Sequence, residues 1–147
     1  MLSDTLRTGS RVFLDSAVLI YFLEENPRYL PSVNALFKRI AERGLYGIAS
    51  YLTLMEVIVK PLKEKRPDLV ERYRDILLNN DSLTVFPMER VVAEKAATLR
   101  ASHQNLKTPD AIQLATAMVH GTDAFLTNDN RLTAVRGIRV IVLDDHI

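Results

Sequence analysis

The sequence predicts an α/β protein, a three-layer α/β/α sandwich with a mainly parallel five-stranded sheet. Three observations predict it. Five short apolar segments have the length of strands, the segments between them repeat apolar residues at helical spacing, and the two kinds of segment alternate along the chain. Such alternation favours a parallel sheet with helices on both faces. No internal repeat or flexible linker interrupts the 147 residues, so we expect a single domain over residues 1–147.

The predicted strands are rich in Val, Ile, Phe and Leu. They are RVFLD (11–15), YGIAS (46–50), SLTVF (82–86), DAFLT (123–127) and IRVIV (138–142). The first and last carry apolar residues almost continuously, which is typical of strands buried on both faces.

Helices are expected between these strands. Apolar residues recur at i, i+3, i+4 and i+7 over 33–40 and at similar spacing over 92–99, and further helices are expected at about 16–25, 51–62, 67–79 and 109–120. Thr108 is expected to cap the last of these, with Pro109 at the first helical position. His120 followed by Gly121 suits its C-terminal end.

The composition excludes several classes of protein. No stretch approaches the roughly 20 apolar residues of a membrane span, and the N-terminal MLSDTLRTGS lacks the pattern of a signal peptide. Without cysteine, disulfides, thiolate chemistry and cysteine-ligated zinc are excluded. We therefore expect a soluble cytoplasmic protein with no membrane partner. A net charge of +1 gives no argument for or against a polyanionic partner.

Four acidic residues stand where they could meet. In parallel α/β sheets, ligand sites form outside the carboxyl ends of the strands. Asp15 ends the first strand, and Asp129 follows the fourth in the turn TNDNR. Asp110 lies in the first turn of the helix TPDAIQLATAMV, where the helix dipole favours a negative charge. Glu56 lies within the helix SYLTLMEVIVK.

Each acid also has a local explanation, and taken singly we favour it. Asp15 suits an N-cap, Asp110 is a routine first-turn acid, and Asp129 is a common turn residue. TLME spells a capping box that ends at Glu56. A helix that starts at Ser50 would instead put this glutamate near the second turn, facing the end of the sheet.

Taken together, the four acids predict a metal site. Clustered carboxylates repel each other, and burying them is costly unless cations compensate the charge. Mg²⁺ and Mn²⁺ prefer oxygen ligands, and two such ions can stabilise the attacking and leaving oxygens in phosphodiester cleavage. The candidate catalytic residues and metal ligands are therefore Asp15, Glu56, Asp110 and Asp129.

The order and spacing of these residues resemble those of the PIN domain family, metal-dependent ribonucleases that include the VapC-like toxins of toxin-antitoxin pairs. The resemblance runs over a core at about 11–143. Its best-matched pieces are FLDSAVLIYFLE, the Glu of SYLTLMEV, the block TPDAIQLATAMVHGTDAFLTND and the strand IRVIVLD. The family's metal site combines an early Asp, a mid-chain Glu, a later helical Asp and the Asp of a T-x-D turn, which fall here on the same four acids.

The resemblance implies both an activity and partners. It implies a Mg²⁺- or Mn²⁺-dependent endoribonuclease that cleaves RNA phosphodiesters, acts as the toxin of a toxin-antitoxin pair, binds a small antitoxin protein and forms a homodimer. Thr127 supplies the T-x-D hydroxyl, and Ser16 follows the first Asp where the family usually has Thr or Ser, so both are expected to support the site. Many relatives have Asn two residues after the first Asp, where this chain has Ala17.

Basic residues are weaker candidates for contact with RNA. They are a local cluster of Lys60, Lys63, Lys65 and Arg66 beyond the helix that carries Glu56, and Lys107 before Asp110. Side chains of this kind are more often solvated, and the alternative is a salt-sensitive contact with phosphates. His103, His120 and His146 are expected at the surface or at helix ends rather than in the site.

Two other functions stay open. A catalytically silent PIN-like module would bind RNA or a protein without cleavage, although four intact acids argue against it. A phosphoacceptor receiver domain has a similar length and architecture. It requires adjacent acids after the first strand, an acceptor Asp after the third and a Lys after the fifth, whereas Asp15 is followed by Ser-Ala and the later strands end in VFPMER and VLDDHI.

Overall fold

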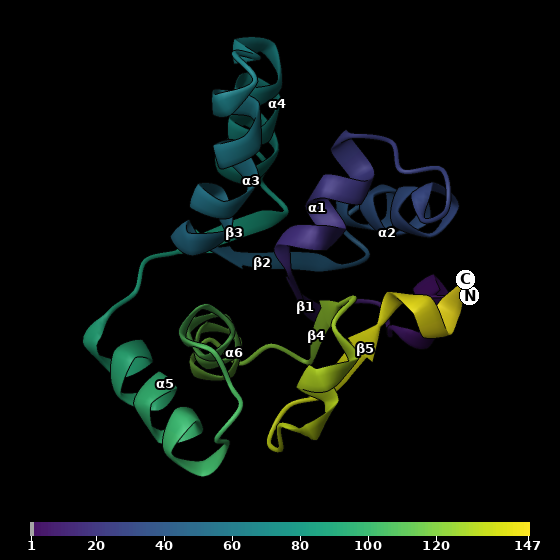
Figure 1. Ribbon diagram of the computed structural model, residues 1–147. Coiled ribbons are helices and arrows are strands. Elements are labelled where there is room, and N and C mark those ends of the chain that lie inside the picture. The colour runs from purple at the N-terminus through teal and green to yellow at the C-terminus, as the bar shows by residue number, and fades with distance from the viewer. Residues whose placement is uncertain (1) are drawn as a thin grey trace.

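Five parallel strands form one sheet in the order β3-β2-β1-β4-β5 in a computed structural model that describes residues 2–147 (Figure 1). The strands are β1 (Arg11–Leu14), β2 (Tyr46–Ser50), β3 (Leu83–Phe86), β4 (Ala124–Thr127) and β5 (Val140–Val142). Every neighbouring pair is parallel, which confirms the predicted sheet. The chain adds β2 and β3 on one side of β1 and then β4 and β5 on the other, so the strand order changes direction between β1 and β4, the topological switch point of the sheet.

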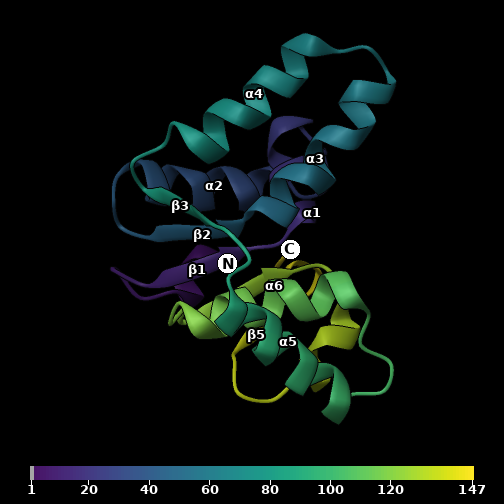
Figure 2. The same ribbon diagram turned by 90° about the vertical axis from the view of Figure 1, so that its left-hand side faces the viewer.

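Helices cover both faces of the sheet. They are α1 (Ser16–Leu23), α2 (Leu30–Ala41), α3 (Tyr51–Lys63), α4 (Pro67–Leu78), α5 (Arg90–Ser102) and α6 (Thr108–Val119), with short 3₁₀ helices η1 (Leu2–Thr5), η2 (Asn130–Ala134) and η3 (Leu143–His146). In Figures 1 and 2, α1 to α4 lie on one side of the sheet and α5 and α6 on the other, which confirms the three-layer prediction. No helix among residues 2–147 is long and apolar enough to cross a membrane.

The alternation of side chains along β1 produces two apolar cores. Val12 and Leu14 face the core shared with α1 to α4, and Phe13 faces the core shared with α5 and α6. Strand register places Phe13 beside Phe125 of β4, and their rings stack with centroids 4.9 Å apart. Both faces of β1 are therefore buried, and its carboxyl end is firmly positioned.

The two ends of α6 were predicted with different success. Gly121 follows its last turn with a φ of 66°, a conformation that glycine adopts without steric cost, and the N–H of Thr122 donates to the Ala117 carbonyl at 3.0 Å, as predicted for this C-terminal end. The prediction that Thr108 caps the helix is wrong. The Lys107 carbonyl accepts the first helical hydrogen bond, so the helix starts one residue earlier and Thr108 is its first residue.

Candidate functional site

The carboxyl ends of β1 and β4 lie side by side at the switch point, where the strand order changes direction. In open α/β sheets, ligands bind at this point. The register pairs Leu14 with Leu126, so the next residues along each strand, Asp15 and Thr127, are also neighbours. The Thr127 hydroxyl donates a 2.7 Å hydrogen bond to Oδ2 of Asp15. Strand pairing therefore fixes one carboxylate at this edge of the sheet.

Asp15 is both the N-cap of α1 and part of the acidic site. Its Oδ1 accepts a 2.9 Å hydrogen bond from the backbone N–H of Ser16, so the local explanation is also correct. Burial raises the pKa of Asp15 above its ordinary value, although the hydrogen bonds from Thr127 and Ser16 lower it. The negative charges of Glu56 and Asp129 add to the rise. The carboxylate is held in a place where positive charge would stabilise it.

Glu56 lies in the second turn of α3, because the helix starts earlier than TLME alone suggests. Ser50 is the N-cap and forms the capping box with Thr53, so the capping box that ends at Glu56 is wrong. Oε1 of Glu56 accepts a 2.8 Å hydrogen bond from the Ser16 hydroxyl. Ser16 thus contacts the glutamate of α3 as well as the aspartate that precedes it.

Gln113, which the sequence prediction missed, links α6 to α3. Its side chain is buried, and Nε2 donates to Oε1 of Glu56 at 3.1 Å and to Oγ1 of Thr53 at 2.9 Å. Its Oε1 accepts a hydrogen bond from the Ser50 hydroxyl. The available signal was its spacing, because Gln113 lies three residues after Asp110 and therefore on the same side of the helix. Gln113 therefore holds Glu56 from α6, whereas Ser16 holds it from α1.

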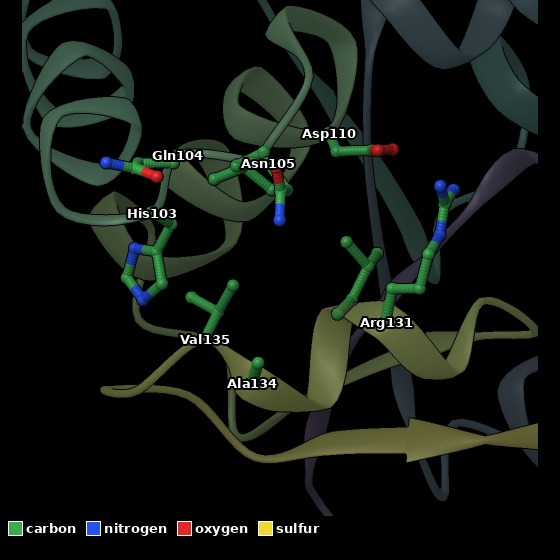
Figure 3. Close-up of a pocket in the computed structure, with 9 residues that line it drawn as sticks. His103, Gln104, Asn105, Asp110, Arg131, Ala134 and Val135 are labelled. Carbon is green, nitrogen blue, oxygen red and sulfur yellow. The ribbon is translucent and has the colours of Figure 1, made fainter.

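Asp110 lies in the first turn of α6 and is half-buried. In Figure 3 its carboxylate is directed toward the guanidinium of Arg131. Burial raises the pKa of Asp110, the charges of Asp15 and Asp129 raise it further, and the charges of Arg131 and Lys107 lower it. These mutual effects place the three aspartates within electrostatic range of one another at the same edge.

Asp129 is the N-cap of η2 and is paired with Arg131, a second residue that the sequence prediction missed. Its backbone N–H donates to the Thr127 hydroxyl at 3.1 Å. The Arg131 guanidinium donates from Nε to Oδ1 at 2.9 Å and from Nη2 to Oδ2 at 2.6 Å. This ion pair lowers the pKa of Asp129. The ion pair between Asp129 and Arg131 depends on the tight turn at the start of η2, and the sequence TNDNR does not predict that this turn is a 3₁₀ helix.

The predicted acids therefore come from four separate elements and influence one another at one edge of the sheet. Among residues 2–147, no three acidic or histidine side chains are close enough to form a ready-made metal cage. Asp129 is instead paired with Arg131, and Glu56 with Ser16 and Gln113. The donor chemistry still fits a hard divalent cation, because every candidate ligand is a carboxylate. The positive charge of a cation would also compensate the cost of burying Asp15 and its repulsion by Glu56 and Asp129, which raise its pKa.

The predicted basic residues fall into two groups. Lys107, the N-cap of α6, lies close enough to the site for its charge to lower the pKa of Asp110 and Asp129. The cluster over residues 60–66 lies at the far end of α3 and in the loop that follows it. There Lys60 pairs with Glu64 at 3.9 Å, and Nη2 of Arg66 lies 2.9 Å from Oδ2 of Asp68. The ion pairs that Lys60 and Arg66 form within residues 2–147 join them to Glu24, Glu64 and Asp68 and not to the four candidate ligands.

These features define a parallel α/β protein with an acidic site at its switch point, and the comparisons with known proteins agree. The PIN domain model matches residues 12–138, so the chain belongs to the PIN domain family. No curated protein sequence matches it.

Three similar solved structures share the fold. VapBC2 from Rickettsia felis, bound to a promoter DNA fragment, has a TM-score of 0.72 at 13% identity over 90% of this chain and 98% of that one. DNA-bound VapBC from Salmonella typhimurium has a TM-score of 0.69 at 20% identity over 91% and 98%. A toxin-antitoxin complex from Klebsiella pneumoniae has a TM-score of 0.58 at 24% identity over 90% and 97%.

Proposed function

We propose that this chain forms a single PIN-like domain that acts as a metal-dependent endoribonuclease, the toxin of a toxin-antitoxin pair. The observation that supports the proposal is that Asp15, Glu56, Asp110 and Asp129 come from four separate elements to the carboxyl edge of β1 and β4, where the charge of each affects at least one of the others. Membership of the PIN domain family supports the same activity.

In this proposal the four acids hold Mg²⁺ or Mn²⁺. When bound, such ions supply positive charge that stabilises the attacking and leaving oxygens of phosphodiester cleavage. Thr127 orients Asp15 through its hydroxyl, and Ser16 and Gln113 orient Glu56 from two sides. Lys107 adds positive charge that attracts the RNA backbone toward the acids.

A protein partner is part of the same proposal. The similar complex from Klebsiella pneumoniae is a toxin-antitoxin complex, and both VapBC structures are complexes as well. Along α3, large apolar side chains are exposed at Tyr51, Met55, Val59 and Leu62. Apolar patches on a helix face commonly mark a protein interface, which supports a small antitoxin as a partner and a homodimer as the toxin's own assembly.

Cleavage of RNA by the purified chain tests the activity. We expect cleavage with Mg²⁺ or Mn²⁺ and none in EDTA, and a fall of at least about 100-fold in Asp15→Asn or Asp110→Asn. Asp81→Asn is the matched control, because Asp81 is an exposed acid before β3, at the opposite edge of the sheet. Cleavage that persists in Asp15→Asn and Asp110→Asn would remove the acids from the mechanism.

A catalytically silent binding module is the alternative function. The observation in its favour is the ion pair between Arg131 and Asp129. The guanidinium binds both carboxylate oxygens of Asp129, one of the four proposed metal ligands. RNA that binds the chain but stays intact across Mg²⁺, Mn²⁺ and several RNA sequences would establish this alternative. Cleavage that depends on Asp15 would exclude it.

A further inference from the structure

A cavity of about 330 Å³ opens beside the acids, on the side of α5 and α6 (Figure 3). It lies between the loop that joins α5 to α6 and the 3₁₀ helix η2. Asp110 and Arg131 line its edge nearest the site. The volume is at the lower end of the roughly 300–1,000 Å³ that small-molecule sites have, which is enough for one nucleotide and too little for a folded segment.

The walls combine an apolar floor with polar groups at the rim. Leu106, Leu132 and Val135 are buried and form the floor. In Figure 3 the amide nitrogen of Asn105 is directed into the cavity. Among residues 2–147, no other group hydrogen-bonds to this amide, so its donors and its acceptor are free for a ligand.

His103 also lines the cavity, at the C-terminal end of α5. Its Nδ1 lies 2.9 Å from the Leu99 carbonyl, which only accepts hydrogen bonds. Nδ1 therefore carries a proton and donates to this carbonyl, which fixes the orientation of the ring beside the cavity. The Asn105 amide offers both donors and an acceptor above an apolar floor. A nucleobase has the complementary surface, with two apolar faces and a polar edge.

Arg131 connects this cavity to the acids. Its Nε and Nη2 bind Asp129, and no contact within residues 2–147 uses Nη1. The remaining donors of a guanidinium match a phosphate oxygen. A nucleotide whose phosphate binds Nη1 of Arg131 could place its base in the cavity. The phosphodiester next to it along the RNA would then lie beside Asp110.

We propose that this cavity is a nucleobase subsite, which binds one base of single-stranded RNA next to the scissile phosphate and thereby sets the sequence preference of cleavage. The proposal rests on the proposed ribonuclease function for the identity of the ligand. It places His103 in the wall of an RNA-binding cavity, whereas the sequence predicts only a residue at the surface or at a helix end.

Binding of single nucleotides tests the subsite without any need for cleavage. The four 5′-ribonucleoside monophosphates are titrated in EDTA into the full ¹⁵N-labelled chain, with inorganic phosphate as the reference. We expect at least one nucleotide to shift the backbone amides of Asn105 and Ala134, and phosphate alone to leave them in place. If no nucleotide shifts them, or phosphate shifts them equally, the base subsite is wrong. An absence of RNA cleavage would leave this result unaffected and would refute only the ribonuclease proposal.

Two variants separate the cavity from the rest of the surface. Ala134→Trp fills the cavity from an exposed position, and we expect nucleotide affinity to fall at least about tenfold. Asn105→Ala should reduce the difference in affinity between the four bases. Ala101→Trp is the matched control, because Ala101 is exposed on α5 and does not line the cavity. Equal nucleotide affinity in Ala134→Trp and Ala101→Trp would overturn the proposal.

Discussion

Replacement of Thr127 by valine tests how the sheet positions Asp15. Thr127 is fully buried, donates to Asp15 at 2.7 Å and accepts from the Asp129 N–H at 3.1 Å. Valine has nearly the same shape, so no cavity forms, but both hydrogen bonds are lost. A bond to a charged group contributes about 1.5–3 kcal/mol and a neutral one about 0.5–1.5 kcal/mol. We therefore expect the free energy of unfolding to fall by about 2–4 kcal/mol at neutral pH.

The loss should also depend on pH. The Thr127 hydrogen bond lowers the pKa of Asp15, so Thr127→Val raises that folded-state pKa further above the unfolded value. Stability from a group with a raised folded pKa is present at low pH and is lost as pH rises through that pKa. The difference from the unmodified chain should therefore be larger at about pH 8 than at about pH 5.

Urea denaturation in EDTA measures both effects, with Thr127→Ser as the control. Serine keeps the hydroxyl and loses one methyl group, at a cost of about 1 kcal/mol. If the unmodified chain cleaves RNA, Thr127→Val should also lower cleavage by about 10- to 100-fold, and serine should retain most of it. Valine and serine variants of equal stability at both pH values would refute the positioning role of the hydroxyl.

Three further outcomes follow from the same structure. In EDTA at neutral pH, Asp110→Asn should raise the Tm, because burial and the negative charges of Asp15 and Asp129 raise the pKa of Asp110. The gain in Tm should disappear when the pH falls below the ordinary pKa of an aspartate, since Asp110 is then protonated in both the folded and the unfolded chain. A lower Tm at neutral pH would argue against the repulsion. Gln113→Leu should lower the free energy of unfolding by about 1–3 kcal/mol, because it removes the buried amide that donates to Thr53 and Glu56 and accepts from Ser50; an unchanged urea midpoint would contradict this. Burial lowers the pKa of His120, so its contribution to stability should be lost as pH falls below about 6.5, and His120→Phe should remove that part of the pH dependence in thermal unfolding.

The sheet and helices could be predicted because their signals are local. Each predicted strand and helix is present, with ends that differ from the prediction by a few residues. Thr108 shows the limit of such signals, because a backbone hydrogen bond to the Lys107 carbonyl starts α6 one residue earlier. A helix end is decided by backbone geometry that a side-chain preference indicates only approximately.

The site could be predicted only in part from the sequence. The four acids could be placed because Asp15 and Asp129 follow strands, Asp110 lies in the first turn of a helix, and Glu56 lies in a helix that starts directly after a strand. The structure places all four at one edge of the sheet. Gln113 and Arg131 were missed, since their roles depend on contacts with Glu56 and Asp129 that only the folded chain creates. His103 was assigned correctly to a helix end, yet its contribution to the cavity requires the loop after α5 to meet η2.

Binding of Mn²⁺ to the purified chain, followed by electron paramagnetic resonance, tests the central claim most directly. The four carboxylates are proposed to form one metal site that serves RNA cleavage. We predict that the unmodified chain and the control Asp81→Asn bind Mn²⁺ with equal affinity, and that Asp15→Asn and Asp110→Asn each bind it at least about tenfold more weakly. A chain that fails to bind Mn²⁺, or that binds it equally well without Asp15 and without Asp110, would contradict the account.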